Sequence, residues 1–295
     1  MTKNSAAMEN LEFLSGQQGN VVEEPGYKYH IVQWLNGQKS LAALGKSNPM
    51  YTGGFFFKTK QDDSFPLGEE MVYTFHNGDE EEVRAIGGAD VIVMASRLHW
   101  YENDPAGGRR WLKGYKKGAK GRNQFLLIFR GAEEWHEKNG PLMLSVYGVN
   151  GLLMARAYED FRTKVHAVAE ELSAAAGGPP RLDAYTFYMR IVPGDFEKAS
   201  PNFDTLITPP KLDLSGYDKK NPAPYLNEVA VPKRFRDENG FLTAIWDECQ
   251  EWAREEPFGT YEQDMAIDDG DNAGADVNVD NSNEYEIGDI LNKDE

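Results

Sequence analysis

Apolar and polar residues alternate along much of the first two-thirds of the chain, and this period of two predicts β-strands. The alternation is clearest in Ala89–Tyr101, which is rich in β-branched residues, and in Gln124–Arg130, where Phe125, Leu127 and Phe129 share one face. Further strand patterns cover Tyr27–Leu35, Tyr51–Lys58, Met71–His76, Val83–Ile86, Leu142–Val149 and Asp183–Val192. Because short turns join nearly all of these segments, the pattern indicates an antiparallel barrel or sandwich rather than alternating βαβ units.

Two other segments repeat apolar residues every three or four positions, which predicts amphipathic helices. The first follows Asn150, a candidate helix cap, and continues to Gly177. Its apolar stripe consists of Met154, Tyr158, Phe161, Val165, Val168 and Leu172. The second, Phe241–Glu255, places Trp246, Cys249 and Trp252 on one side. We therefore expect a mainly β protein with two or three helices, of the α+β class.

The expected architecture is an OB-like antiparallel barrel with an amphipathic helix packed across one opening, and a mixed α+β sandwich is the alternative. Four regions follow from the composition. They are a flexible N-terminal arm over 1–26, an OB-like domain over 27–192, an irregular wrap with a C-terminal helix over 193–260, and an acidic tail over 261–295. The tail is too polar to bury a core, so we expect it to be disordered.

The 295 residues are 40% hydrophobic and 27% charged, as in ordinary globular proteins. No apolar run approaches the roughly 18 residues that a membrane span needs, and the first residues do not have the pattern of a signal peptide. The single cysteine, Cys249, excludes an internal disulfide and a zinc site built from several cysteines. We expect a cytoplasmic location, in a bacterial host cell or its nucleoid.

Negative charge is concentrated in the tail. Residues 261–295 contain twelve acidic residues and one lysine, which gives -11 of the formal net charge of -17. The remainder of the chain, at -6, is only mildly acidic. A local basic surface on it is electrostatically plausible.

One such surface is predicted around Gly108–Arg122, which reads GRRWLKGYKKGAKGR and contains no acidic residue. Cations hold the phosphates of single-stranded nucleic acid, and aromatic rings stack on its bases. The alternative is a solvated hairpin arm with Trp111 inside the core. The predicted nucleic-acid-binding residues are Arg109, Arg110, Trp111, Lys113, Tyr115, Lys116, Lys117, Lys120 and Arg122, with Trp100, Tyr101 and Phe56 as further stacking candidates.

Patterns for catalysis or metal binding are weak. The five histidines are scattered, without HxH or HExxH spacing, and no GxSxG motif is present. The sequence therefore predicts no catalytic residue, no metal site and no cofactor. An enzyme acting on nucleic acid would need carboxylates near the basic segment, and the nearby ones are Asp90, Glu102 and Asp104.

The β-rich body, the basic aromatic segment and the acidic tail together resemble the layout of phage- or plasmid-type single-stranded DNA-binding proteins. The resemblance implies a non-enzymatic protein that coats single-stranded DNA with little sequence preference during replication or recombination. Its tail would compete for the DNA groove and recruit replication or recombination proteins. The C-terminus departs from that family's terminal aromatic or Pro-Phe, so Ile287, Ile290 and Leu291 would have to recruit them. The alternative is an acidic interaction or assembly protein, of virion or DNA-mimic type, that binds no nucleic acid.

Overall fold

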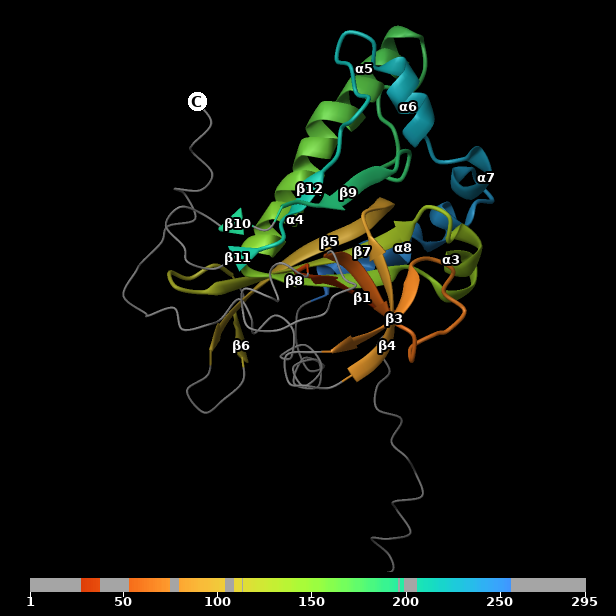
Figure 1. The fold of residues 1–295 in the computed structure, drawn as a ribbon. Helices are drawn as coiled ribbons and strands as arrows, with labels where there is room; N and C mark the ends of the chain where they lie inside the picture. The colour runs from red at the N-terminus through yellow and green to blue at the C-terminus, as the bar shows by residue number, and fades with distance from the viewer. Residues whose placement is uncertain are drawn as a thin grey trace, which may run out of the picture.

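The computed structural model of the chain describes residues 28–37, 53–74, 80–103, 109–112, 114–195, 197–198 and 206–255. The predicted N-terminal arm and acidic tail lie outside these residues. The described chain forms a mixed α and β fold, in which a large, mainly antiparallel sheet has helices packed against it (Figure 1).

Ten of the described strands form one sheet, in the order β12-β9-β5-β7-β8-β1-β2-β4-β3, with β6 beside the outer end of β5. The pairing of β1 with β8 is parallel, and the other described pairings are antiparallel. The strands are β1 Ile31–Leu35, β2 Gly54–Lys58, β3 Glu69–Thr74, β4 Glu80–Gly87, β5 Ala89–Asn103, β6 Arg109–Leu112, β7 Lys120–Phe129, β8 Leu142–Tyr147, β9 Met189–Pro193 and β12 Pro210–Leu212, with β10 Glu197–Lys198 and β11 Leu206–Ile207 in a separate pair.

The described helices are α3 Glu133–Asn139, α4 Gly148–Phe161, the π-helical turn η1 Arg162–His166, α5 Ala167–Ala175, α6 Ala223–Val229, α7 Lys233–Arg236 and α8 Phe241–Arg254. The first predicted helix corresponds to α4, η1 and α5, which follow one another without a break, and the second to α8. The predicted cap is wrong, because α4 begins before Asn150 and follows Tyr147 without a side-chain cap. α3 lies outside both of the predicted helical segments.

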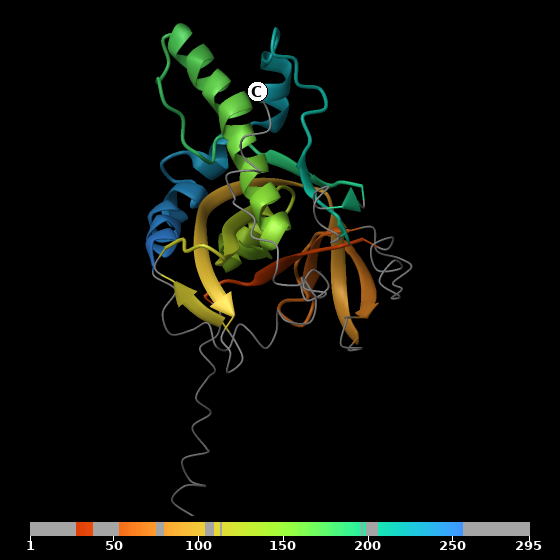
Figure 2. The ribbon, with the colours of Figure 1, turned by 90° about the vertical axis from the view of Figure 1, so that its left-hand side faces the viewer.

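The predicted closed barrel is not confirmed. Within the described residues no pairing joins β12 to β3, the two ends of the strand order, so the sheet stays open. The sheet continues past β8 through β1 into β2, β4 and β3. These further strands extend the described sheet, which does not close into a barrel. β5 nevertheless bends strongly (Figure 2). Its pairing with β7 is irregular between Val93 and Ala95, and an irregularity of this kind bends a strand.

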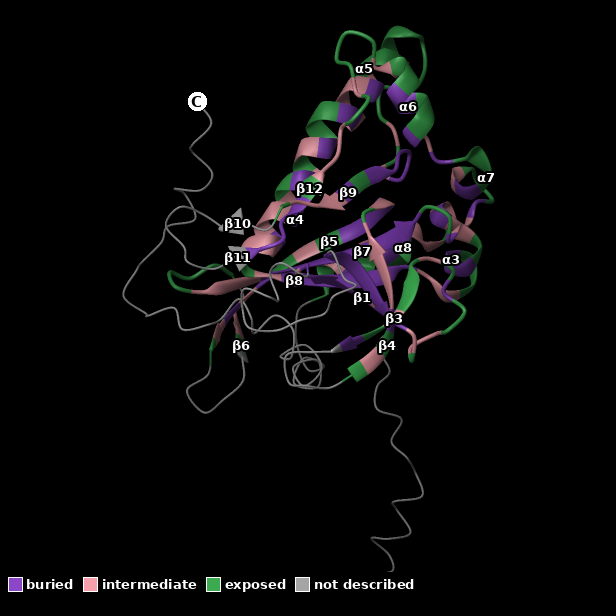
Figure 3. Ribbon diagram, in the orientation of Figure 1, coloured by how far each residue is buried: buried purple, intermediate pink, exposed green. Residues whose placement is uncertain are grey.

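Both faces of the central strands are buried, which explains their nearly continuous apolar sequence (Figure 3). As predicted, Phe125, Leu127 and Phe129 share one face, where they pack with α4 and α5 residues in the main core. The alternate residues Leu126 and Ile128 pack with α8 on the other face. Each fully buried large apolar side chain contributes about 1.5–3 kcal/mol, so α8 is held to the sheet by the hydrophobic effect.

Candidate nucleic-acid interface

The predicted basic segment supplies β6 and the start of β7, which pair with the two edges of the outer end of β5. We call this region the basic ribbon, and it comprises residues 98–103, 109–112 and 114–122. The ribbon lies far from α6, at the opposite end of the molecule (Figure 1). Because side chains alternate along each strand, it has two faces.

The first, which we call the packed face, carries His99, Tyr101, Trp111, Lys120 and Arg122 at register positions that lie opposite one another. Arg122 is 3% exposed and donates a hydrogen bond to Ser145 Oγ over 2.9 Å. Its guanidinium also lies 5.1 Å from the Tyr147 ring centroid and 5.8 Å from that of Trp111. This cation is thus built into the packing of the ribbon.

Trp111 is half-buried on this face. Its ring centroid lies 5.4 Å from that of Tyr101 and 6.0 Å from that of His99. Tyr101 is itself buried, so it supports Trp111 and presents little ring surface. The indole is neither sealed in the core nor fully open.

His99 supplies no positive charge to the ribbon at neutral pH. Burial of the imidazole is the largest cause of the lowered pKa of His99, and the positive charges of Arg97 and Arg122 lower this pKa further. Together they lower the pKa of His99 from 6.5 to about 4.

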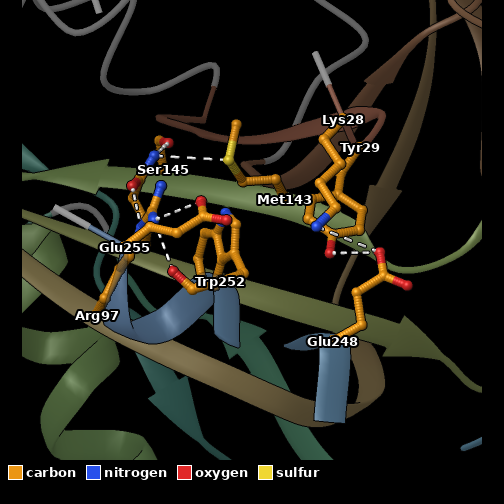
Figure 4. A network of polar contacts seen from close by, with 9 residues as sticks. Lys28, Tyr29, Arg97, Met143, Ser145, Glu248, Trp252 and Glu255 are labelled. Atoms are coloured by element: carbon orange, nitrogen blue, oxygen red, sulfur yellow. Dashed lines mark hydrogen bonds and ion pairs between the residues drawn. The ribbon is translucent and has the colours of Figure 1, made fainter. Parts of the chain in front are cut away.

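The packed face continues to the end of α8 through Arg97 (Figure 4). Arg97 Nη1 donates to the carbonyl oxygen of Trp252 over 2.8 Å, and its guanidinium lies 3.9 Å from the Trp252 ring centroid. Its Nε donates to Gln124 Oε1 over 2.9 Å, and Glu255 lies 3.8 Å away. α8 therefore ends directly beside this face.

The second face, which we call the exposed face, carries an apolar and aromatic patch. Trp100 and Tyr115 meet edge to face with ring centroids 5.0 Å apart, and Tyr115 is 52% exposed. Leu98 beside them is 42% exposed. A Cβ at Gly121 would lie only 3.3–3.4 Å from Leu98 and Trp100, so glycine lets both side chains lie close over β7. The exposed ring of Tyr115, with half-buried Trp100 against it, suits base stacking.

Two exposed cations adjoin the patch and share one carboxylate. Glu102 accepts from Lys116 Nζ over 2.8 Å and from Arg110 Nη2. These hydrogen bonds hold the pKa of Glu102 below its usual value of 4.5, and the bond from Lys116 has the larger effect. Lys117 nearby is exposed too.

The predicted site residues are thus divided between the two faces of one ribbon. Trp100, Arg110, Tyr115 and Lys116 meet on the exposed face, whereas Tyr101, Trp111, Lys120 and Arg122 lie on the packed face. Lys113 and the side chain of Arg109 lie outside the described residues.

The structure contradicts two stacking candidates, namely Tyr101, which is 4% exposed, and Phe56. Phe56 is 0% exposed and packs against Leu35, Tyr73 and Val83, in a small core on the opposite side of β2 from Phe55 and Phe57. Its strand is covered on both faces, so its ring is inaccessible to a base.

Several residues in or beside the ribbon were not predicted from the sequence. Leu98 could have been found, because it shares the alternation of Trp100. Ser145, Tyr147 and Gln124 gave no signal, because their place beside Arg122 depends on the pairing of β7 with β8.

The carboxylates considered for a nuclease do not gather. Asp90 pairs with Arg130 at the other end of β5, twelve residues from Glu102 and so about 40 Å along the strand. Asp104 lies outside the described residues. In the part of the chain that the structure describes, no group of three or more His, Cys, Asp or Glu side chains is placed to hold a metal ion.

No protein-family model, curated protein or solved structure matches the chain. Among the described helices, none combines the length and apolarity needed to cross a membrane.

Proposed function

We propose that the protein binds single-stranded DNA through the exposed face of the basic ribbon and coats it with little sequence preference during replication or recombination. The observation that carries this proposal is the pair of exposed Tyr115 and half-buried Trp100, with the exposed cations Arg110, Lys116 and Lys117 around it. Stacking on such rings accepts every base, and the cations attract the phosphates. Hence the site would bind strands of any sequence.

The strand order supports an OB-like core within the larger sheet. β5, β7 and β8 form an antiparallel meander, α4 follows the third strand, and β9 returns antiparallel to the first. An OB fold has these neighbours, together with a last strand parallel to the third. Here β1, from the N-terminal side, supplies that parallel neighbour. The connection between the first two OB strands commonly binds oligonucleotides, and in this chain it is the basic ribbon.

The acidic tail is proposed to compete with DNA for the ribbon and, when displaced, to recruit replication or recombination proteins. α8 ends beside Arg97, and forty residues follow Glu255. At about 3.3 Å per residue, that length spans far more than the ribbon. Its charge of -11 complements the cations. Competition between these polyanions would weaken steeply as salt is added.

A fluorescence titration of labelled oligo-dT tests the proposal, with the full chain and with a variant truncated after Thr260. We expect the truncated protein to bind more tightly at low salt. The combined change Lys116→Glu and Lys117→Glu should weaken binding roughly tenfold or more and flatten its salt dependence. No binding by the truncated protein at low salt would refute the proposal. Co-purification with a basic protein instead of nucleic acid would favour the interaction-protein alternative.

A further inference from the structure

The three charged side chains at the tip of the exposed face form a compact unit. Glu102 stands on β5, Arg110 stands opposite it on β6, and Lys116 comes from the connection between β6 and β7. Each carboxylate oxygen of Glu102 accepts from one cation, Oε2 from Arg110 and Oε1 from Lys116. Three separate chain segments thus converge on one anion.

We propose that Arg110 and Lys116 are a clamp for one backbone phosphate, and that Glu102 is an internal competitor that occupies the clamp and lowers the affinity for DNA. This inference rests on the proposed function. A phosphodiester presents two anionic oxygens, as a carboxylate does, so the same two donors suit both groups. Glu102 therefore marks where a phosphate would be held.

A phosphate from solvent can reach the two cations and displace the carboxylate of Glu102. The side chains of Arg110 and Lys116 are each 64% exposed, whereas that of Glu102 is 21% exposed. Ion pairs on a surface are individually weak, so an incoming phosphate can displace the carboxylate. The lowered pKa of Glu102 keeps it ionised at neutral pH, so the competitor is always present.

The clamp also lies at the right place for a stacked nucleotide. Trp100 precedes Glu102 by two residues on the same face, which is about 7 Å along the strand, and Tyr115 directly precedes Lys116. A phosphate in the clamp would therefore adjoin a base on the aromatic pair. Glu102 would set how tightly a strand binds there.

The test is a titration of labelled oligo-dT, over a range of salt, with the full chain and its Glu102→Gln variant. We expect the variant to bind roughly 5- to 30-fold more tightly at low salt, since two weak pairs and one repulsion are removed. Its salt slope should steepen by about one. A carboxylate that merely positions the two cations predicts the opposite, weaker binding on substitution.

Two further variants control this experiment. Glu80→Gln makes the same change of net charge at an exposed position on β4 and should alter affinity less than about twofold. Lys116→Gln should weaken binding more in the Glu102→Gln background than in the unaltered chain, because the clamp is then open. Thermal melting should be nearly the same for all of them.

Each outcome decides the matter. Equal or weaker binding by Glu102→Gln, with the unaltered chain binding oligo-dT, overturns the clamp and leaves the proposed function standing. A gain equal to that of Glu80→Gln also overturns it. Absence of binding by every variant at low salt overturns both the clamp and the proposed function.

Discussion

Both faces of the basic ribbon contain cations and aromatic rings, and both are built on β5, β6 and β7, with the β6–β7 connection adding to the exposed face, yet they differ in what those residues can do. On the packed face, Arg122 is 3% exposed and its charge is used within the protein. On the exposed face, Arg110 and Lys116 are 64% exposed and both pair with the surface carboxylate of Glu102. Cations and rings on one ribbon therefore fall into a structural set and a set that is available to a ligand.

A basic, aromatic sequence therefore predicts a binding surface only when the alternation of side chains between the two faces of each strand is taken into account. Trp100 and Tyr115 can meet a base from solvent, whereas Tyr101 supports Trp111 from below. Substitutions on the packed face should change stability, and those on the exposed face should change binding. Four experiments test this division.

The largest effect is expected for Arg122→Leu. The change removes a buried hydrogen bond to Ser145 and the contacts with the Tyr147 and Trp111 rings. We expect the free energy of unfolding to fall by about 2–4 kcal/mol, measured by urea denaturation. Lys117→Leu, on the exposed loop of the same ribbon, should change it by no more than about 0.5 kcal/mol. Equal losses of unfolding free energy in the two variants would contradict the division between the two faces.

Acid should destabilise the packed face through His99. Its pKa is about 4 in the folded chain and near 6.5 when unfolded, so its contribution is fully present above pH 6.5 and is lost as the pH falls from 6.5 to 4. Because solvent screens part of this shift, the loss is about 1–3 kcal/mol. His99→Gln should reduce the pH dependence of the melting temperature in this window, while buried His136, whose pKa is also lowered to about 4, maintains part of it. An unchanged pH profile would contradict this assignment.

Stacking should depend on the exposed face. Trp100→Ala and Tyr115→Ala should each weaken oligo-dT binding by about 1–3 kcal/mol, with little change in melting temperature. Trp111→Ala is the matched change on the packed face, and we expect it to weaken binding less and to lower the melting temperature more. A larger loss of affinity for Trp111→Ala, at unchanged stability, would exchange the roles of the two faces.

The smallest effect is expected for a single exposed cation. Lys117→Gln should weaken binding slightly at low salt and reduce the salt slope by about one, as expected for the loss of one phosphate contact. Lys164 is also exposed, but it lies in η1 and pairs with Asp160. Lys164→Gln should therefore leave the slope unchanged, and an equal change in both variants would indicate a general charge effect.

Several of the main strands and helices could be predicted from the local periodicity of apolar residues. Alternation in Ala89–Tyr101 and Gln124–Arg130 predicted β5 and β7, and the apolar stripes predicted the helix from α4 to α5 and helix α8. These features were predictable because each depends on neighbours a few residues apart. β6 was missed inside the basic segment, as its four residues are too short to show a period.

The amino-acid sequence was sufficient to predict β5, β7, the helix from α4 to α5 and helix α8, and it shows seven cations concentrated in one segment of an acidic chain. The tertiary structure alone decided that β1 lies parallel to β8, that Phe56 is enclosed, and that Arg122 faces Tyr147 while Arg110 faces Glu102. The physical reason is that the side of a strand that is buried depends on partners distant in sequence, through sheet pairing and the packing of α8. The local sequence of a strand does not specify those partners.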